Sequence, residues 1–195
     1  NGKCEASQNI DFQVNPLPAI ERIENNMSVC LNLPAITIGV KSSDSRSYNY
    51  TWARDGTDFP PNINGTDSSI LVGLGGEYLV TATTTDGTNC SKTMKITLSE
   101  SEIATFVKKD VELKDLYAGP NNTITILTTT LGIGDYEFAL DDQTGPYQDE
   151  PVFENVRPGK HTVYVRDKNG CGTVNMDIWV IGYKKFFTPN GDGYT

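Results

Sequence analysis

The chain has 195 residues, and its 16 Lys and Arg against 25 Asp and Glu give a formal net charge of −9. Nucleic-acid binding depends on positive charge that meets the phosphates, so this composition excludes it. No run approaches the roughly 20 apolar residues of a membrane helix, and we expect a chain that does not span a membrane. Short alternating blocks of apolar residues, with 18 Gly and 10 Pro, predict an all-β fold rich in turns.

The first alternating block, residues 10–14, recurs as residues 94–98 and 176–180. Each block follows a cysteine that comes after a turn sequence, and these cysteines (Cys4, Cys90 and Cys171) recur at intervals of 86 and 81 residues. This period is too long for a solenoid and fits a small β-sandwich. We therefore predict a tandem array. Residues 1–18 would be the last strand of a preceding domain, and residues 19–102 and 103–182 would be two complete domains.

Within the first predicted domain, alternation places strands at residues 36–40, 48–52 and 78–82. In the second, it places them at residues 124–128, 136–140, 152–156 and 161–165. Residues 76–82 and 159–165 share one pattern, which begins with Gly76 and Gly159. Short strands with turn signals every ~8–12 residues predict antiparallel β-sandwiches.

Cys30, Trp52 and Cys90 follow one another in the first predicted domain. Their order resembles the Cys…Trp…Cys arrangement of immunoglobulin domains, which implies a disulfide between Cys30 and Cys90. The alternative is two unpaired buried thiols. Cys4 is expected to have its partner in the preceding domain, and Cys171 is either a buried free thiol or an inter-chain site.

Residues 186–193 of the C-terminal sequence combine two aromatic residues with a sequence of turn-forming residues. They are Phe186, Phe187, Thr188, Pro189, Asn190, Gly191, Asp192 and Gly193. This sequence resembles the opening of the type B, gliding-motility-associated sorting element of Bacteroidota type IX secretion cargo. Residues 136–142, 153–159 and 163–171 are similar to the repeat of large gliding-motility adhesins. Residues 19–102 resemble the polycystic-kidney-disease-like and Ig-like repeats of the same surface proteins.

The resemblance implies tandem Ig-like domains, with residues 183–195 as the start of the sorting element. It implies a non-enzymatic adhesin or stalk at the outer-membrane cell surface or in the extracellular space. Its partners would be the type IX outer-membrane translocon and shuttle proteins, which recognise residues 186–193, and a surface polysaccharide or other cell-surface ligand. The second predicted domain lacks the early cysteine that many such repeats carry.

No arrangement of residues predicts catalysis. His161 is the one histidine of the chain. The alignment of the two repeats gives it the position that Tyr78 has in the first, which predicts a half-buried strand residue. We expect no enzyme and no cofactor, with calcium as the candidate exception at Asp141, Asp142, Asn190 and Asp192. The alternative for these acidic positions is ordinary turn chemistry.

Two other functions stay open. The first is a carbohydrate-binding or accessory module of a secreted hydrolase, for which Tyr117, Tyr147 and Trp179 are the candidate sugar-stacking residues. The preferred alternative for Trp179 is packing in a core or between domains. The second is a surface assembly subunit in which residues 1–18 pair with a neighbouring chain.

Overall fold

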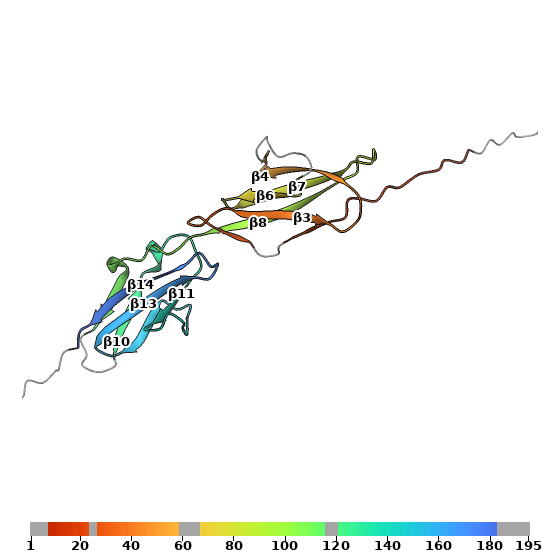
Figure 1. Ribbon diagram of the computed structural model, residues 1–195. Coiled ribbons are helices and arrows are strands. Elements are labelled where there is room, and N and C mark those ends of the chain that lie inside the picture. Colours follow the sequence, from red (N-terminus) through yellow and green to blue (C-terminus); the bar gives the residue numbers. More distant parts are fainter. Residues whose placement is uncertain (1–7, 24–26, 59–66, 116–120, 183–195) are drawn as a thin grey trace, which may run out of the picture. The chain divides into compact units, whose positions relative to one another are not determined.

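The computed structural model describes residues 8–23, 27–58, 67–115 and 121–182. These residues form strands and two short 3-10 turns, with no α-helix among them (Figure 1). The first of two compact units takes its described residues from Asn1–Asn26, Thr37–Leu71 and Gly76–Thr97. The second takes them from Met27–Ile36, Val72–Gly75 and Leu98–Thr195. Within the described ranges, no helix has the length and apolar character needed to cross a membrane.

Eight strands belong to the first part of the chain. One sheet has the order β1-β3-β6, and the other has the order β2-β8-β7-β4-β5. The strands are β1 (Ile20–Arg22), β2 (Ser28–Cys30), β3 (Ile36–Ser42), β4 (Tyr48–Arg54), β5 (Thr57–Asp58), β6 (Ser69–Val72), β7 (Gly76–Thr84) and β8 (Ser91–Ser101). β2 pairs with β8 in parallel, whereas β1–β3, β4–β5 and β4–β7 are antiparallel.

The core of the first unit follows directly from alternation. Tyr48, Tyr50 and Trp52 are all buried along β4, because every second side chain of a strand points to the same face. The Trp52 indole also donates a hydrogen bond of 3.1 Å to the carbonyl of Asp67. The predicted aromatic strand at residues 48–52 is confirmed.

The second unit contains two three-stranded sheets with the orders β12-β10-β9 and β11-β13-β14. Their strands are β9 (Val111–Lys114), β10 (Asn122–Ile126), β11 (Tyr136–Leu140), β12 (Val152–Val156), β13 (Gly159–Asp167) and β14 (Thr173–Val180). The 3-10 turns are η1 (Lys108–Asp110) and η2 (Thr128–Thr130). Residues from both sheets share one apolar core, including Ile124, Phe138, Phe153, Val163 and Ile178. The predicted all-β class with antiparallel sandwich sheets is confirmed, and β2–β8 adds one parallel pair.

β7 and β13 occupy equivalent places in the two repeats. Both strands have nine residues, and both begin with a glycine at positive φ: 136° at Gly76 and 144° at Gly159. Val80 and Val163 then point inward and are fully buried. The shared pattern of residues 76–82 and 159–165 therefore reflects one local structure used twice.

A tyrosine at the start of one strand in each repeat holds the segment that leads into that repeat. Tyr48 begins β4, and its hydroxyl accepts a hydrogen bond of 3.3 Å from the Ala19 amide. Tyr136 begins β11, and its hydroxyl donates one of 3.1 Å to the Glu102 carbonyl. The Tyr48 hydroxyl also donates to the Asp44 carboxylate, and this bond holds the pKa of Asp44 well below its ordinary value.

The two units are interleaved in the sequence, whereas the predicted domains meet at a single boundary after residue 102. The second unit includes Met27–Ile36 and Val72–Gly75, which precede that position. Residues 8–18, the described part of the predicted segment 1–18, belong to no strand of this structure. Their assignment to a preceding domain stays a prediction.

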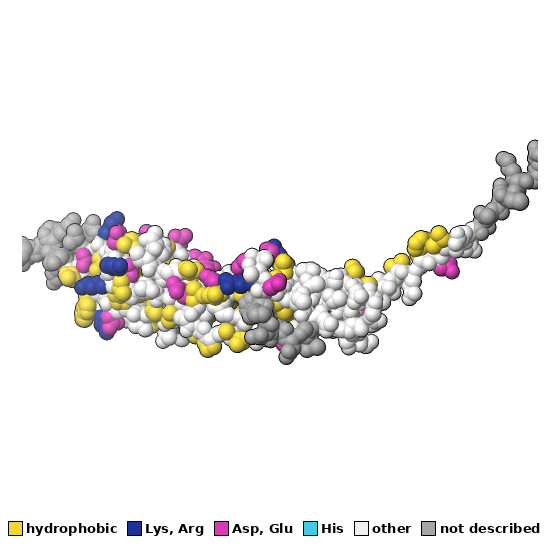
Figure 2. Space-filling view, turned by 90° about the horizontal axis from the view of Figure 1, so that it is seen from above, with side chains coloured by type: hydrophobic (Ala, Val, Ile, Leu, Met, Phe, Trp, Pro, Cys, Tyr) yellow, Lys and Arg dark blue, Asp and Glu magenta, His cyan; other side chains and the backbone are white. Residues whose placement is uncertain are grey.

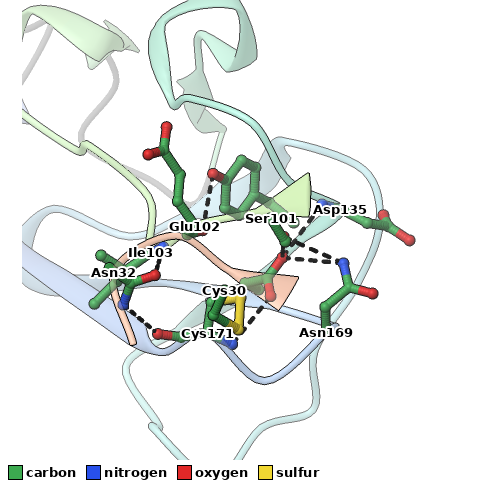
Figure 3. The surroundings of a disulfide bond; sticks show 10 residues. Cys30, Asn32, Ser101, Glu102, Ile103, Asp135, Asn169 and Cys171 are labelled. Atoms are coloured by element: carbon green, nitrogen blue, oxygen red, sulfur yellow. Dashed lines mark hydrogen bonds between the residues drawn. A yellow bond between two sulfur atoms is a disulfide. The ribbon is translucent and has the colours of Figure 1, made fainter. Parts of the chain in front are cut away.

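The disulfide joins Cys30 to Cys171, with a Cα–Cα distance of 5.3 Å (Figure 3). The predicted Cys30–Cys90 bridge is wrong, and Cys90 is a free thiol. Cys30 lies opposite Ser101 in the β2–β8 register, at the far end of an eleven-residue strand from Cys90. A strand of that length spans about 35 Å, whereas disulfide-bonded Cα atoms lie within about 7 Å. The expectation that Cys171 is a free thiol or an inter-chain site is also wrong, because Cys171 is bonded to Cys30 of the same chain. Cys4 lies outside the described residues.

Hydrogen bonds reinforce the disulfide on both sides (Figure 3). The Asn32 side chain donates to the Cys171 carbonyl at 2.9 Å and accepts from the Ile103 amide at 3.0 Å. The Asp167 carboxylate is buried and accepts from the Ser101 hydroxyl at 2.6 Å and from the Cys171 amide at 3.1 Å. A buried carboxylate is tolerated when such donors surround it, so this end of the second unit is closed by covalent and polar contacts together.

Replacing both Cys30 and Cys171 with Ser should destabilise the second unit. A sequence separation of 141 residues gives a loop-closure contribution of about 5 kcal/mol in the chain-entropy model. Urea denaturation followed by circular dichroism measures the loss. Cys90→Ser is the matched control and should leave the transition in place. Equal transitions for the wild type and the double variant would contradict the structural role of this bond.

Candidate ligand groove beside strand β14

A groove of about 400 Å³ lies in the second unit between β9 and β14. Among the described residues these strands end their respective sheets, so the groove follows the edges of two sheets. β9 contributes Val111 and Leu113, and β14 contributes Met176, Ile178 and Trp179. Its surface is mostly apolar, which is typical of a binding site.

Trp179 gives the groove an exposed aromatic face. Its side chain is 66% exposed, whereas its neighbours Ile178 and Val180 are buried. Alternation along β14 explains this arrangement, because inward-facing residues on both sides force Trp179 outward. The expectation that Trp179 packs in the core is wrong, and its alternative, packing between domains, stays a prediction.

Charged groups flank the groove. The Asp177 carboxylate forms an ion pair of 2.8 Å with Lys160 and accepts a hydrogen bond of 2.8 Å from the Thr162 hydroxyl. The Lys160 bond, with that of Thr162, lowers the pKa of Asp177. The Asp115 carboxylate accepts a hydrogen bond of 3.1 Å from the Ile181 amide and so links the ends of the two edges. Lys108 also lines the groove and forms no ion pair with any residue that the structure describes.

The predicted calcium residues Asp141 and Asp142 lie in the turn after β11, where their oxygens serve the turn itself. Asp141 accepts from the Thr162 amide at 2.8 Å and contacts the His161 Nδ1 atom at 2.7 Å. Asp142 accepts from the Thr144 hydroxyl at 2.7 Å and amide at 2.8 Å, and these bonds lower the pKa of Asp142. Among the described residues, no group of three or more His, Cys, Asp or Glu side chains is placed to hold a metal.

Asn190 and Asp192, the other two candidates for calcium, lie outside the described residues. The same is true of the whole predicted recognition motif, residues 186–193, and of Tyr117. The Arg166 guanidinium covers a face of the Tyr147 ring and lies 3.6 Å from the ring centre. Of the three aromatic residues considered for sugar stacking, Trp179 is therefore the one that the structure places beside a groove.

His161 lies in β13, and both ring nitrogens have partners. Nδ1 contacts Asp141, and Nε2 lies 2.7 Å from the Arg157 carbonyl oxygen. A serine or cysteine nucleophile is not among these partners, so the geometry gives the histidine a structural role in the turn.

Most groove residues were not predicted from the sequence. Val111 and Leu113 precede Met176 by more than sixty positions, and the two strands belong to different sheets. Trp179 had a usable signal, because the alternation of Ile178 and Val180 fixes its outward direction.

No protein-family model matches the chain, and no curated protein matches it. The chain is similar to the crystal structure of immunoglobulin domains 1–4 of Sidekick-1, with a TM-score of 0.52 and 14% identity. It is also similar to Sidekick-1 immunoglobulin domains 1–5, with a TM-score of 0.50 and 12% identity. The matches cover 89% and 87% of this chain but 51% and 40% of those chains. At this identity the likeness shows an immunoglobulin-like fold alone.

The two tryptophans should differ sharply in their contribution to stability. Trp52→Ala empties a core site and should lower the free energy of unfolding by about 3–5 kcal/mol. Trp179→Ala removes an exposed side chain and should change it by less than ~0.5 kcal/mol. Urea denaturation of both variants measures this difference. Comparable losses would mean that Trp179 is buried in solution.

Proposed function

We propose that the chain is part of a non-enzymatic adhesin or stalk, exported by the type IX secretion system to the outer-membrane cell surface or the extracellular space. The supporting observation is an immunoglobulin-like unit closed by the Cys30–Cys171 disulfide. Structural disulfides persist in oxidising compartments, which favours a place outside the cytoplasm. Domains of this kind act as rigid spacers and as binding modules.

The tail supports the export route by its sequence. Residues 186–193 would be recognised by the translocon and its shuttle proteins, and residues 183–195 would begin the sorting element. The stalk would bind a surface polysaccharide or another cell-surface ligand. The proposal requires no cofactor, and calcium at Asp141, Asp142, Asn190 and Asp192 remains a secondary hypothesis.

Deleting residues 186–193 in the source cells should abolish surface display, because the secretion machinery would lose its recognition motif. Protease shaving of intact cells, followed by immunoblotting, measures the exposed fraction against total protein. Asp58→Ala, an exposed substitution in β5, is the control and should leave display unchanged. Normal display of the deletion variant would refute recognition through this motif.

The exposed Trp179 beside the groove favours a carbohydrate-binding module as a second candidate function. Sugar rings stack on exposed aromatic faces, where apolar C–H groups meet the ring. A glycan array probed with the wild-type chain should give signals that Trp179→Ala loses by tenfold or more. Tyr147→Phe is a matched aromatic control. Signals that survive Trp179→Ala would exclude the groove as the sugar site.

A further inference from the structure

The outer edge of β14 differs from that of β8 at residues 99–101, although both are the last strands of their repeats. β2 runs parallel to β8 and pairs Ser28, Val29 and Cys30 with Ser99, Glu100 and Ser101. β14 ends the order β11-β13-β14, and no described strand pairs with its outer edge. The connection between β1 and β3 has thirteen residues and contains β2, whereas that between β9 and β10 has seven.

The open edge adjoins the apolar groove described above. Trp179 and Ile181 line the groove and are 66% and 52% exposed. An unpaired edge offers backbone donors and acceptors, and an adjacent apolar groove offers sites for alternate side chains of an added strand. The groove therefore has the properties of a strand-addition site.

The same chain contains a segment suited to such a site. Ile10, Phe12 and Val14 are 68%, 86% and 88% exposed, and they alternate with polar residues. Figure 2 shows apolar side chains exposed along the extended segment that leads to the grey N-terminal residues. In an added strand these three side chains would share one face, so one pairing would remove all of them from water.

We propose that residues 8–15 of a second copy of this chain add as a strand to the outer edge of β14. Ile10, Phe12 and Val14 would face the groove. Because the donor and acceptor surfaces differ, the contact is heterologous and builds linear assemblies. This inference concerns self-association and does not depend on the adhesive function or on the export route proposed above.

Sedimentation velocity of the full chain between 1 and about 500 μM tests the association. The wild type should show concentration-dependent dimers and longer species. Phe12→Ser should weaken association at least tenfold, and the matched control Leu71→Ser, at an exposed apolar residue of β6, should not. Monomeric wild-type chain at all concentrations, or an unchanged Phe12→Ser variant, would overturn the proposal.

A synthetic peptide of residues 8–17 tests the occupant directly. Added to the folded Phe12→Ser chain, it should shift the amide resonances of β9 and β14, and a Phe12→Ser peptide should bind at least tenfold more weakly. Shifts confined to other strands, or none, would overturn the proposal and favour residues 8–15 as a strand of a preceding domain. A glycan that binds at Trp179 and displaces no peptide would likewise overturn it.

Discussion

The disulfide between Cys30 and Cys171 is the constraint on which the rest of the second unit depends. It ties β2 to the turn between β13 and β14, and it thereby recruits Met27–Ile36 into a unit whose other residues mostly follow position 97. The Asn32 side chain and the buried Asp167 carboxylate fix the same turn by hydrogen bonds. A covalent bond with a separation of 141 residues restricts the unfolded chain strongly, so the small sandwich does not rely on its apolar core alone.

Local patterns predicted the strands well because their physical cause is local. The alternation of Tyr48, Tyr50 and Trp52 places all three in the core, and the glycine that begins β7 recurs at the start of β13. The cysteine pairing failed because it depends on the ends of strands rather than on their faces. Cys30 lies beside Ser101, and the immunoglobulin-like order of Cys, Trp and Cys contains no information about that register.

The groove could not be predicted from the sequence for a related reason. Its walls come from β9 and β14, which never pair with each other and belong to different sheets. A pattern along one strand indicates which side chains point inward, but the space between two edges depends on how the sheets pack. Trp179 is the exception, since its outward direction follows from the two buried neighbours in β14.

The two repeats share a framework and differ at one edge. In one repeat the short strand β2 covers the end of β8, and the disulfide at Cys30 anchors that strand in place. In the other, β14 ends its sheet among the described residues and lies beside an apolar groove. Natural sheets usually protect their edges, because an exposed edge invites another strand. The immunoglobulin-like framework therefore pairs the end of one edge through β2, which Cys30 anchors, whereas among the described residues the equivalent edge lies beside the exposed Trp179.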